Sequence, residues 1–415
     1  MIYMKVKIPK HKLTNEKLCV YNKPKKVYIP LISGNDENIT ILVNKGEYVY
    51  KGSIIGKRKG DFRIPIHSSV SGIVVDFEER TCFNGKKIKC IVIENDFKEK
   101  IEMRVSVKRN INKYSKEDFI DRLKECGIIG LGGAGFPTYV KYEANNIDTL
   151  IINAVECEPY ITADYAIAKQ KCEEILETID AILEINKIKK AYIAIQKDNV
   201  ELRKVFDSFI GTYLKINIKL VDNFYSVGWE RTLVKKITGK DYDKVPSEVG
   251  VIVNNISTIY AIYEALKYNK PLIERFITFS GENIDDKRNV LVKIGTDAME
   301  ILKEFSLKED SLIIAGGPMM GTKVDDLVIS ANLNCVLALN KNVEQPSICL
   351  KCGKCVEACP AKLSPVLIMN GKEKNLRKLH PEKCIGCGLC SYVCPAKLLV
   401  REKVKEAKNK VRGDK

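Results

Sequence analysis

Eight cysteines near the C-terminus constrain this chain more than any other feature. They form two runs with one spacing, Cys349-x2-Cys352-x2-Cys355-x3-Cys359-Pro360 and Cys384-x2-Cys387-x2-Cys390-x3-Cys394-Pro395. In this spacing three neighbouring thiolates hold one [4Fe-4S] cluster, and the fourth reaches across to the other cluster. The spacing therefore predicts two clusters, the first on Cys349, Cys352, Cys355 and Cys394, and the second on Cys384, Cys387, Cys390 and Cys359.

The second run repeats the first 35 residues later, down to Cys-Pro-Ala-Lys-Leu in both, which indicates an internal duplication. Zinc is the alternative, because paired C-x2-C units also build four-cysteine zinc sites. A zinc ribbon, however, needs two separate pairs and has no use for a third cysteine followed by x3-C-P. Disulfides are less favoured still, because no leader peptide points to an oxidising compartment.

Length, charge and hydropathy narrow the class further. A chain of 415 residues predicts two to four domains. The net charge of +16 suits nucleic acid, anionic lipid or an acidic protein. No nucleic-acid-binding motif is present, so we expect an acidic electron carrier or a membrane-bound partner, with a generally lysine-rich surface as the alternative. No apolar run approaches the ~18–20 residues of a membrane span, which predicts a cytoplasmic protein, at most peripheral on the membrane.

Residues 1–105 read as short strands and turns. A Lys-Gly-x-x-Val-x-x-Gly unit beginning at Lys45 is followed by a His-x-x-Val-x-Gly-x-Val unit beginning at His67. This pattern resembles the biotinyl/lipoyl type of β-sandwich. The chain lacks the Met-Lys-Met modification site, so we expect no carried group there, and we interpret His67 as a packing residue.

Residues 106–270 alternate strands and helices, which predicts a parallel sheet covered by helices. A helix is expected over residues 162–184. Five glycines fall within residues 127–135, where backbone can approach a ligand closely, although a plain turn is the alternative. Polar residues follow two apolar strands at Asn153 and Asn254, and open α/β sheets bind ligands at the carboxyl ends of their strands.

The remaining segments complete a multidomain α/β and β architecture. Residues 271–342 return to strands and turns and predict a small β-grasp-like module, with Gly316-Gly317-Pro318 as a structural turn. Residues 343–400 hold the two cysteine runs. Residues 401–415 form a lysine-rich tail that we expect to be a solvated, frayed helix.

Taken together, four stretches and the cysteine repeat resemble the C subunit of the Rnf electron-transport complex. The stretches are Gly-Leu-Gly-Gly-Ala-Gly-Phe-Pro-Thr at 130–138, Asn-Ala-Val-Glu-Cys-Glu-Pro-Tyr at 153–160, Val-Asn-Asn-Ile-Ser-Thr at 253–258 and Gly-Gly-Pro-Met-Met-Gly at 316–321. They occur in family order, and the resemblance runs from about residue 25 to residue 400. It implies a lipoyl-like sandwich, a Rossmann-like FMN/NADH domain, a β-grasp-like (SLBB) module and a two-cluster ferredoxin domain.

That family shares its flavin domain with the NADH-oxidising flavoprotein subunit of respiratory complex I, so the resemblance also implies FMN and NAD(H) as cofactors. Carried over by motif, Gly130, Gly132 and Lys141 would line the flavin and nucleotide, while Asn153, Glu156, Asn254, Asn255 and Thr258 would hold FMN. Glu158 and Glu230 match residues that contact NADH, Gly228 belongs to the same nucleotide loop, and Phe136 matches an aromatic that stacks on the nucleotide. No side chain is expected to act as a catalytic acid or base.

One departure concerns the nucleotide loop. The family usually has Tyr-Pro-x-Gly-Gly-Glu where this chain has Tyr225-Ser-Val-Gly228-Trp229-Glu230, so the sole tryptophan could stack on a ring or block the nucleotide. The predicted function is electron transfer between NAD(H), FMN and two clusters, because a flavin converts a hydride into single electrons. The alternatives are a soluble relative that supplies a dedicated reductase such as proline reductase, a flavin-free iron–sulfur relay, and a cobalamin reductase.

Overall fold

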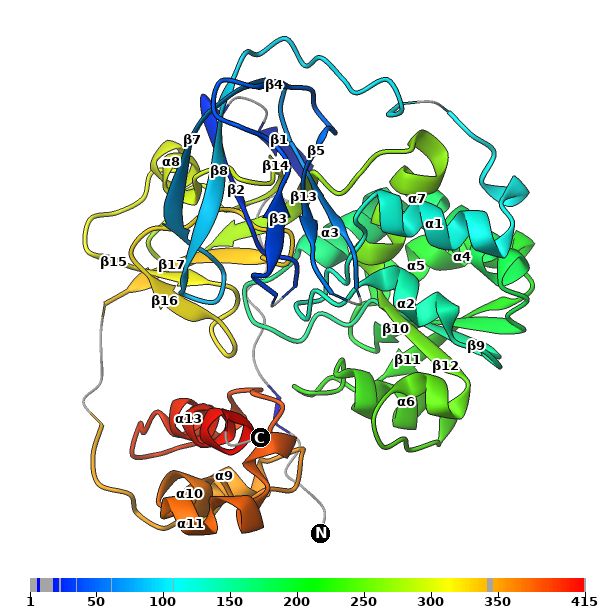
Figure 1. Ribbon diagram of the computed structural model, residues 1–415. Helices are drawn as coiled ribbons and strands as arrows, with labels where there is room; N and C mark the ends of the chain where they lie inside the picture. The colour runs from blue at the N-terminus through cyan, green and yellow to red at the C-terminus, as the bar shows by residue number, and fades with distance from the viewer. Residues whose placement is uncertain are drawn as a thin grey trace.

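The computed structural model describes residues 6–7, 18–21, 24–34, 36–60, 62–106, 108–341 and 346–413. Four groups of elements follow one another along the chain, and the last of them lies below the other three in Figure 1. Within the described ranges, no helix combines the length and the apolar character needed to cross a bilayer.

The first group is a β-sandwich of two small sheets. One sheet has the strand order β2-β8-β7-β4 and the other β3-β5-β6. Their apolar faces meet in a core that includes Val27, Ile55 and Val74. His67 is buried at the end of β6, in agreement with a packing role. The strands are β2 (Lys26–Pro30), β3 (Ile39–Ile41), β4 (Tyr48–Val49), β5 (Ile54–Arg58), β6 (Pro65–His67), β7 (Gly72–Thr81) and β8 (Lys87–Asn95).

The second group is a four-stranded parallel sheet in the order β11-β10-β9-β12, as the β-α-β alternation predicts. The strands are β9 (Thr149–Asn153), β10 (Lys190–Gln196), β11 (Ile216–Val221) and β12 (Val251–Asn255). The helices are α1 (Lys116–Glu125), α2 (Thr138–Glu143), α3 (Ala163–Gln170), α4 (Cys172–Ile185), α5 (Val200–Phe209), α6 (Glu230–Thr238) and α7 (Ile256–Tyr268), with short 3-10 turns at Ile111–Lys113, Ile210–Thr212 and Pro246–Val249. The single helix expected over 162–184 is two helices, because the backbone leaves the helical region at Lys171 (φ −122°, ψ 31°).

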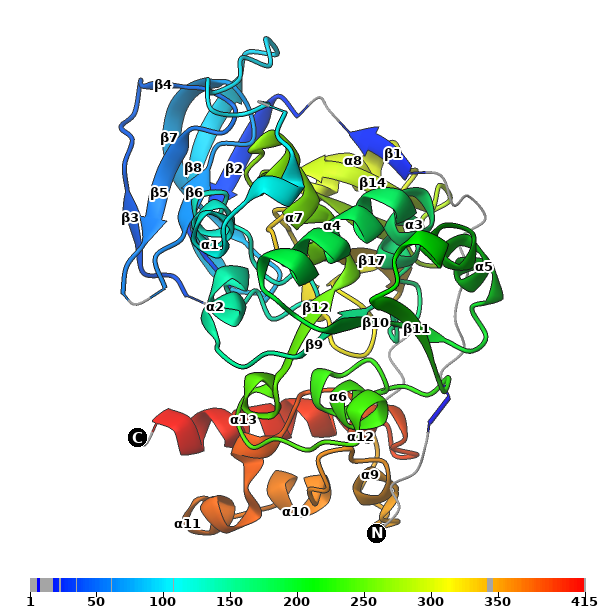
Figure 2. The same cartoon turned by 90° about the vertical axis from the view of Figure 1, so that its right-hand side faces the viewer.

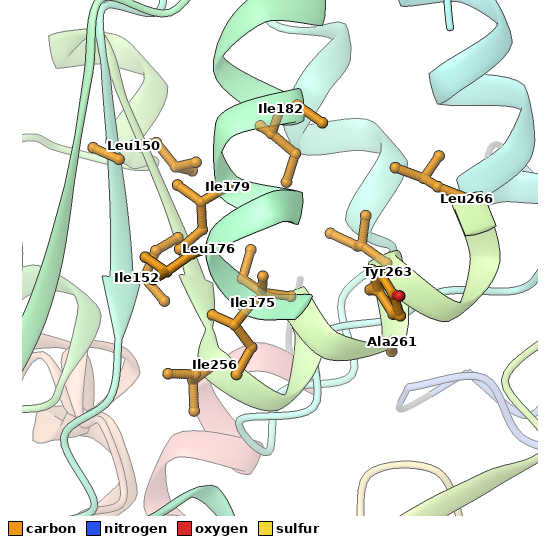
Figure 3. Packing of buried hydrophobic residues seen from close by; sticks show 14 of the residues in the cluster. Leu150, Ile152, Ile175, Leu176, Ile179, Ile182, Ile256, Ala261, Tyr263 and Leu266 are labelled. Atoms are coloured by element: carbon orange, nitrogen blue, oxygen red, sulfur yellow. The ribbon is translucent and has the colours of Figure 1, made fainter. Parts of the chain in front are cut away.

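The largest apolar core lies between this sheet and helices α4 and α7. Figure 3 shows Ile175, Leu176 and Ile179 of α4 directed toward Leu150 and Ile152 of β9. The isoleucines and leucines of α4 recur at steps of three and four residues, so one face of the helix is apolar. This packing holds the sheet rigid below the loops that follow its strands.

The third group is a six-stranded sheet in the order β1-β14-β13-β17-β15-β16. Its elements are β1 (Leu18–Tyr21), β13 (Glu274–Ser280), β14 (Arg288–Lys293), α8 (Ala298–Glu304), β15 (Ser311–Ala315), β16 (Thr322–Val324) and β17 (Cys335–Asn340). Strand β1 pairs in parallel with β14, so a segment that precedes the sandwich in sequence joins a sheet formed some 270 residues later.

The fourth group carries the cysteine runs on short helices. They are α9 (Lys354–Glu357), α10 (Pro365–Met369), α11 (Glu373–Leu376), α12 (Leu389–Tyr392) and α13 (Val400–Gly413), with 3-10 turns at Arg377–Leu379 and Pro381–Lys383. The C-terminal segment is helical as expected, but the expectation that it is solvated and frayed is wrong. Helix α13 is regular, and Val400, Val404, Ala407 and Val411 are buried in the core of this group. These residues repeat at steps of three or four, so the lysines occupy the other face of the helix.

Candidate functional site

The predicted flavin residues gather where β9 and β12 end. Because the two strands are parallel neighbours, Asn153 and Asn255 are register partners in the sheet. Asn255 begins helix α7, and its side-chain oxygen accepts hydrogen bonds from the backbone N–H groups of Ser257 (2.9 Å) and Thr258 (3.3 Å). The same amide donates to Asp164 in the first turn of α3 (2.5 Å). Two helix N-termini therefore open at the same edge of the sheet.

The glycine-rich loop lies against the start of α7. The N–H of Leu131 donates to the buried hydroxyl of Thr258 at 2.9 Å. A side chain on Gly132 would have its Cβ 3.2 Å from the Cβ of Asn255. Gly135 has a left-handed φ of 61°, and a Cβ there would lie 2.5 Å from the Cα of Gly34 in the sandwich. Glycine is thus required both by the backbone conformation and by the close approach of another chain segment.

A buried arginine supports this loop from below. The guanidinium of Arg275, on β13, donates to the carbonyl oxygens of Ala331 (2.5 Å) and Leu131 (3.4 Å). Burial lowers the pKa of Arg275 to about 10, against the favourable charge of Asp164. The sequence contained no signal for this residue, because the carbonyls by which it supports the loop are more than 50 positions away.

Asn153 and Glu156 order the loop that follows β9. The Asn153 amide donates to the carbonyl of Gly228 at 2.7 Å, which links this loop to the predicted nucleotide loop. The Glu156 carboxylate accepts from the N–H groups of Asp164 (3.1 Å) and Tyr165 (3.4 Å), at the N-terminus of α3. A carboxylate is favourable at that position because it meets the positive end of the helix dipole.

A lysine is directed at the end of β12 from helix α2. The Lys141 ammonium donates to the carbonyl of Val253 at 2.7 Å and lies 3.6 Å from the carboxylate of Glu230. Glu230 opens α6 and also accepts from the hydroxyl of Tyr242 at 3.3 Å. The structure thus brings Lys141 and Glu230 together.

The two remaining residues near this edge differ in exposure. Asn254 is buried and donates to the hydroxyl of Tyr142. Phe136, at the end of the glycine-rich loop, is 40% exposed and meets Phe62 of the sandwich edge to face, with ring centroids 5.6 Å apart. An exposed aromatic ring beside the loop is available to stack on a planar ligand.

Glu158 lies elsewhere, under the loop of residues 316–321. Its carboxylate accepts from the N–H of Met319 at 3.0 Å and from the hydroxyl of Tyr225 at 3.4 Å. A Cβ on Gly317 would lie 2.4 Å from this carboxylate. Burial raises the pKa of Glu158 to about 7, while the N–H bonds oppose the rise. The Gly316-Gly317-Pro318 turn therefore packs over the carboxylate of Glu158, a residue that the family resemblance matches to an NADH contact.

Trp229 packs where the loop after β11 meets the cysteine-bearing group. We call this contact the junction cluster; its buried members are Tyr225, Met319, Ala358, Cys387 and Leu389, and Trp229 and Cys157 pack against them. Figure 2 shows α6 and the cysteine-bearing group at the same end of the molecule. The position of the indole thus gives it a packing role between two groups of elements.

An arginine fastens the same junction. The guanidinium of Arg401, near the start of α13, donates to the carbonyls of Met319 (3.2 Å), Met320 (2.7 Å) and Gly321 (3.2 Å). A Cβ on Gly388 would lie 2.3 Å from the Met319 carbonyl oxygen. Sequence reasoning missed Arg401, because its partners are backbone carbonyls about 80 positions away, which no residue type marks.

The eight predicted cluster ligands line two separate hollows of similar size. Hollow one, of about 380 Å³, is lined by Cys349, Cys352, Cys355 and Cys394. Hollow two, of about 370 Å³, is lined by Cys359, Cys384, Cys387 and Cys390.

Each hollow therefore collects three cysteines of one run and the last cysteine of the other, the sets that the spacing predicts. Backbone N–H groups already point at two of the sulfurs, from Gly386 to Cys384 (3.3 Å) and from Leu363 to Cys359 (3.4 Å). Such N–H···S bonds are what a thiolate-bound cluster requires.

This fold and these sites define a multidomain protein with one flavin-type α/β domain and one two-cluster domain. Three family profiles match it: the RnfC barrel sandwich hybrid domain at residues 4–98, the Nuo51 FMN-binding domain at 123–264 and the 4Fe-4S dicluster domain at 343–401.

Among curated proteins, the C subunit of the proton-translocating ferredoxin:NAD(+) oxidoreductase complex of Clostridium ljungdahlii is 33% identical over 85% of this chain and 80% of its own length. The C subunit of the Na(+)-translocating complex of Acetobacterium woodii is 30% identical over 85% and 83%. The C subunit of the ion-translocating oxidoreductase complex of Vibrio cholerae is 31% identical over 86% of this chain and 48% of its own. An NAD+-reducing [NiFe]-hydrogenase structure matches 66% of this chain and 52% of that chain with 15% identity and a TM-score of 0.48.

The chain belongs to the RnfC family, the C subunits of ion-translocating oxidoreductase complexes. Its FMN-binding and dicluster domains confirm the predicted FMN and iron–sulfur cofactors and the electron-transfer function. They also favour the flavin-containing alternatives over a flavin-free relay.

Proposed function

We propose that this protein takes electrons from NADH at a bound FMN and delivers them through two [4Fe-4S] clusters to other subunits of an Rnf-type complex. The observation that carries the proposal is the junction cluster, which joins the loop beside the flavin residues to hollow two. The names of the relatives, ferredoxin:NAD(+) oxidoreductases, support NAD(H) as one redox partner.

The chain divides, in this proposal, into five units, three of which correspond to the matched regions. They are a lipoyl-like sandwich at 1–105, an FMN/NADH domain at 106–270, a β-grasp-like module at 271–342, a ferredoxin domain at 343–400 and a basic C-terminal segment at 401–415. We place the protein in the cytoplasm, held at the membrane face only through partner subunits.

FMN would be held at the shared edge of β9 and β12. There the loop of Gly130 and Gly132 lies against the start of α7, through the hydrogen bond from Leu131 to Thr258. Lys141 supplies a positive charge, and Asn254, Asn255 and Thr258 lie at the start of α7, where the positive end of the helix dipole favours a phosphate. Asn153 and Glu156 order the adjoining loop.

NADH would approach over Phe136 and the loop of Gly228 and Glu230. Glu158 is assigned to the junction instead, because its carboxylate is committed to Met319 and Tyr225. When bound, the flavin accepts a hydride and releases single electrons to iron–sulfur clusters, each of which carries one. The side chains hold and shield these groups, and none needs to donate or remove a proton.

The experiment is anaerobic reconstitution followed by titration with NADH. About one FMN and ~8 Fe per chain are expected, with the flavin and cluster absorbance both bleaching on addition of NADH.

Lys141→Met should weaken FMN binding about tenfold or more, because a charged hydrogen-bond donor is lost. Lys113→Met, on an exposed turn of the same domain, is the matched control. Bound flavin that ignores NADH would contradict the proposal.

A further inference from the structure

The β-sandwich brings an aromatic side chain of its own to the glycine-rich loop. Phe62 lies in the turn between β5 and β6, far outside the FMN-binding match at residues 123–264. Its ring meets the ring of Phe136 with centroids 5.6 Å apart and an angle of 69° between the ring planes. We call this pair the aromatic corner. Phe136 is 40% exposed in spite of the contact, so part of its ring stays open to a ligand.

Close backbone packing holds the corner in place on the side of Phe136. The carbonyl of Phe136 accepts a hydrogen bond from the N–H of Gly130 at 2.8 Å, which closes the glycine-rich loop. The carbonyl of Gly34, which packs against Gly135, accepts from the amide of Asn332 at 3.4 Å. The loop and the sandwich therefore meet through fixed backbone, and a ligand bound between them needs little rearrangement.

An arginine holds the corner on the side of Phe62. The Arg58 guanidinium lies 5.4 Å from the centroid of the Phe62 ring and 2.7 Å from the carboxylate of Asp36. Asp36 also accepts from the N–H of Asn38 at 2.8 Å, and the N–H of Arg58 donates to the carbonyl of Ile64 at 2.9 Å. A cation over an aromatic face stabilises the position of the ring. Phe62 is therefore held in a defined orientation toward Phe136.

The charge of the same hairpin indicates the kind of ligand. Its sequence at 57–63 is Lys-Arg-Lys-Gly-Asp-Phe-Arg, with four basic residues and one acidic residue. Lys57, Lys59 and Arg63 are exposed. Aromatic rings among basic side chains suit a flat base that carries phosphates. NADH has two flat ends, and its nicotinamide has to reach the flavin, so the adenine is the end that is left for the corner.

We propose that Phe62 of the sandwich is a further nucleotide-binding residue, which together with Phe136 holds the adenine ring of NADH. The inference rests on the proposed function, in which the nicotinamide of the same molecule reaches FMN. The base stacks on the open part of Phe136, Phe62 closes its edge, and Arg58 positions Phe62. No bond is made or broken at the corner, which contributes to affinity and not to the rate of hydride transfer.

The first test measures binding without the redox reaction. Reconstituted full-length protein is titrated calorimetrically with ADP-ribose, which has the adenine and both phosphates of NADH but no nicotinamide. Phe62→Leu keeps a bulky apolar side chain without an aromatic ring and should weaken binding about tenfold. Phe62→Tyr keeps the ring and should bind as the wild-type protein does. Phe97→Leu is the matched control, because Phe97 is 55% exposed on the same sandwich, after β8.

The second test compares two electron donors. Iron and FMN contents are recorded first, and bleaching is then followed with NADH and with reduced nicotinamide mononucleotide, which lacks the adenine. Phe62→Leu should raise the NADH concentration that gives half the limiting rate about tenfold and leave the limiting rate unchanged. The same variant should react with the mononucleotide as the wild-type protein does.

The outcomes separate the two proposals. Equal binding of ADP-ribose by Phe62→Leu and Phe97→Leu would overturn the adenine site, as would no binding by the wild-type protein. An equal loss with both electron donors would also overturn it, because Phe62 would then act through the structure of the loop. Wild-type protein that binds ADP-ribose through Phe62 but is not bleached by NADH would overturn the proposed function and leave the base-binding corner in place.

Discussion

The two halves of the cysteine-bearing group share a local structure and differ in what covers them. Gly353 and Gly388 are equivalent in the repeat, have φ angles of 77° and 80°, and each precedes a one-turn helix. A Cβ on Gly353 would meet nothing within 4 Å, whereas one on Gly388 would lie 2.3 Å from the Met319 carbonyl. Duplication therefore produced two similar ligand loops, and packing gave them different neighbours.

Position relative to the flavin domain, and not the ligand set, thus distinguishes the two hollows. Hollow two adjoins Tyr225 and Trp229 through the junction cluster, and Arg401 clamps the loop above it. Cys387 of hollow two belongs to the junction cluster, whereas none of the described residues that line hollow one does. Variants made in equivalent positions of the two halves can show whether the distinction has functional consequences.

The largest effect is expected from removing one cluster ligand at a time. Cys387→Ser and Cys352→Ser should each lower iron by about four atoms per chain. NADH should still bleach the remaining iron–sulfur absorbance in Cys352→Ser but not in Cys387→Ser, because only hollow two adjoins the flavin domain. Cys90→Ala, in the sandwich, is the control. Equal bleaching in both variants would remove the functional distinction between the hollows.

A smaller effect should separate the two equivalent glycines. Alanine at either position costs about 1–2 kcal/mol for its left-handed conformation. Gly388→Ala should cost about 1–3 kcal/mol more, because its Cβ meets a backbone carbonyl that cannot turn away. Urea unfolding measures the difference, and the emission of Trp229, the only tryptophan, should shift to longer wavelength in Gly388→Ala alone. Matching unfolding curves and emission spectra for the two variants would show that the close approach of Gly388 to Met319 does not contribute to stability.

The smallest expected effect is a pH dependence of stability caused by Glu158, which contacts Met319 and Tyr225 of the junction cluster. Burial raises the pKa of Glu158 to about 7, from an ordinary value of 4.5, so the folded state binds a proton more tightly than the unfolded state. Its contribution to stability is therefore present below pH 4.5 and is lost as the pH rises through 7. Glu158→Gln should remove this loss, on the order of 2 kcal/mol between pH 5 and pH 8.

Thermal unfolding at both pH values checks this prediction. Glu117→Gln, on the exposed face of α1, serves as the control for loss of one carboxylate. A Glu158→Gln variant with the same pH profile as the wild-type protein would contradict the proposed effect of burial.

The sequence predicted much of the sheet edge to which we assign FMN, because the residues of that edge follow the ends of parallel strands. Asn153 and Asn255 each follow a run of apolar residues, and parallel strands must place such positions at one edge of the sheet. Glu158 was not predictable, since it is only two residues from Glu156 and yet its carboxylate meets Met319, more than 150 positions away. The tail after Arg401 was predicted as a helix, but its burial was missed, because its many lysines conceal a regular apolar stripe.

Residue types at short, regular spacings were enough to predict the polar loops at the strand ends, the cysteine sets and the order of the domains. Local backbone geometry converts such spacings directly into turns, helices and strands. Tertiary packing alone placed Trp229 in the junction cluster, set Arg401 against the Met319 loop, and brought Cys387 of hollow two, but no described lining residue of hollow one, into the junction cluster. Contacts of this kind join residues far apart in the chain, and their geometry depends on how whole domains pack, which no local spacing specifies.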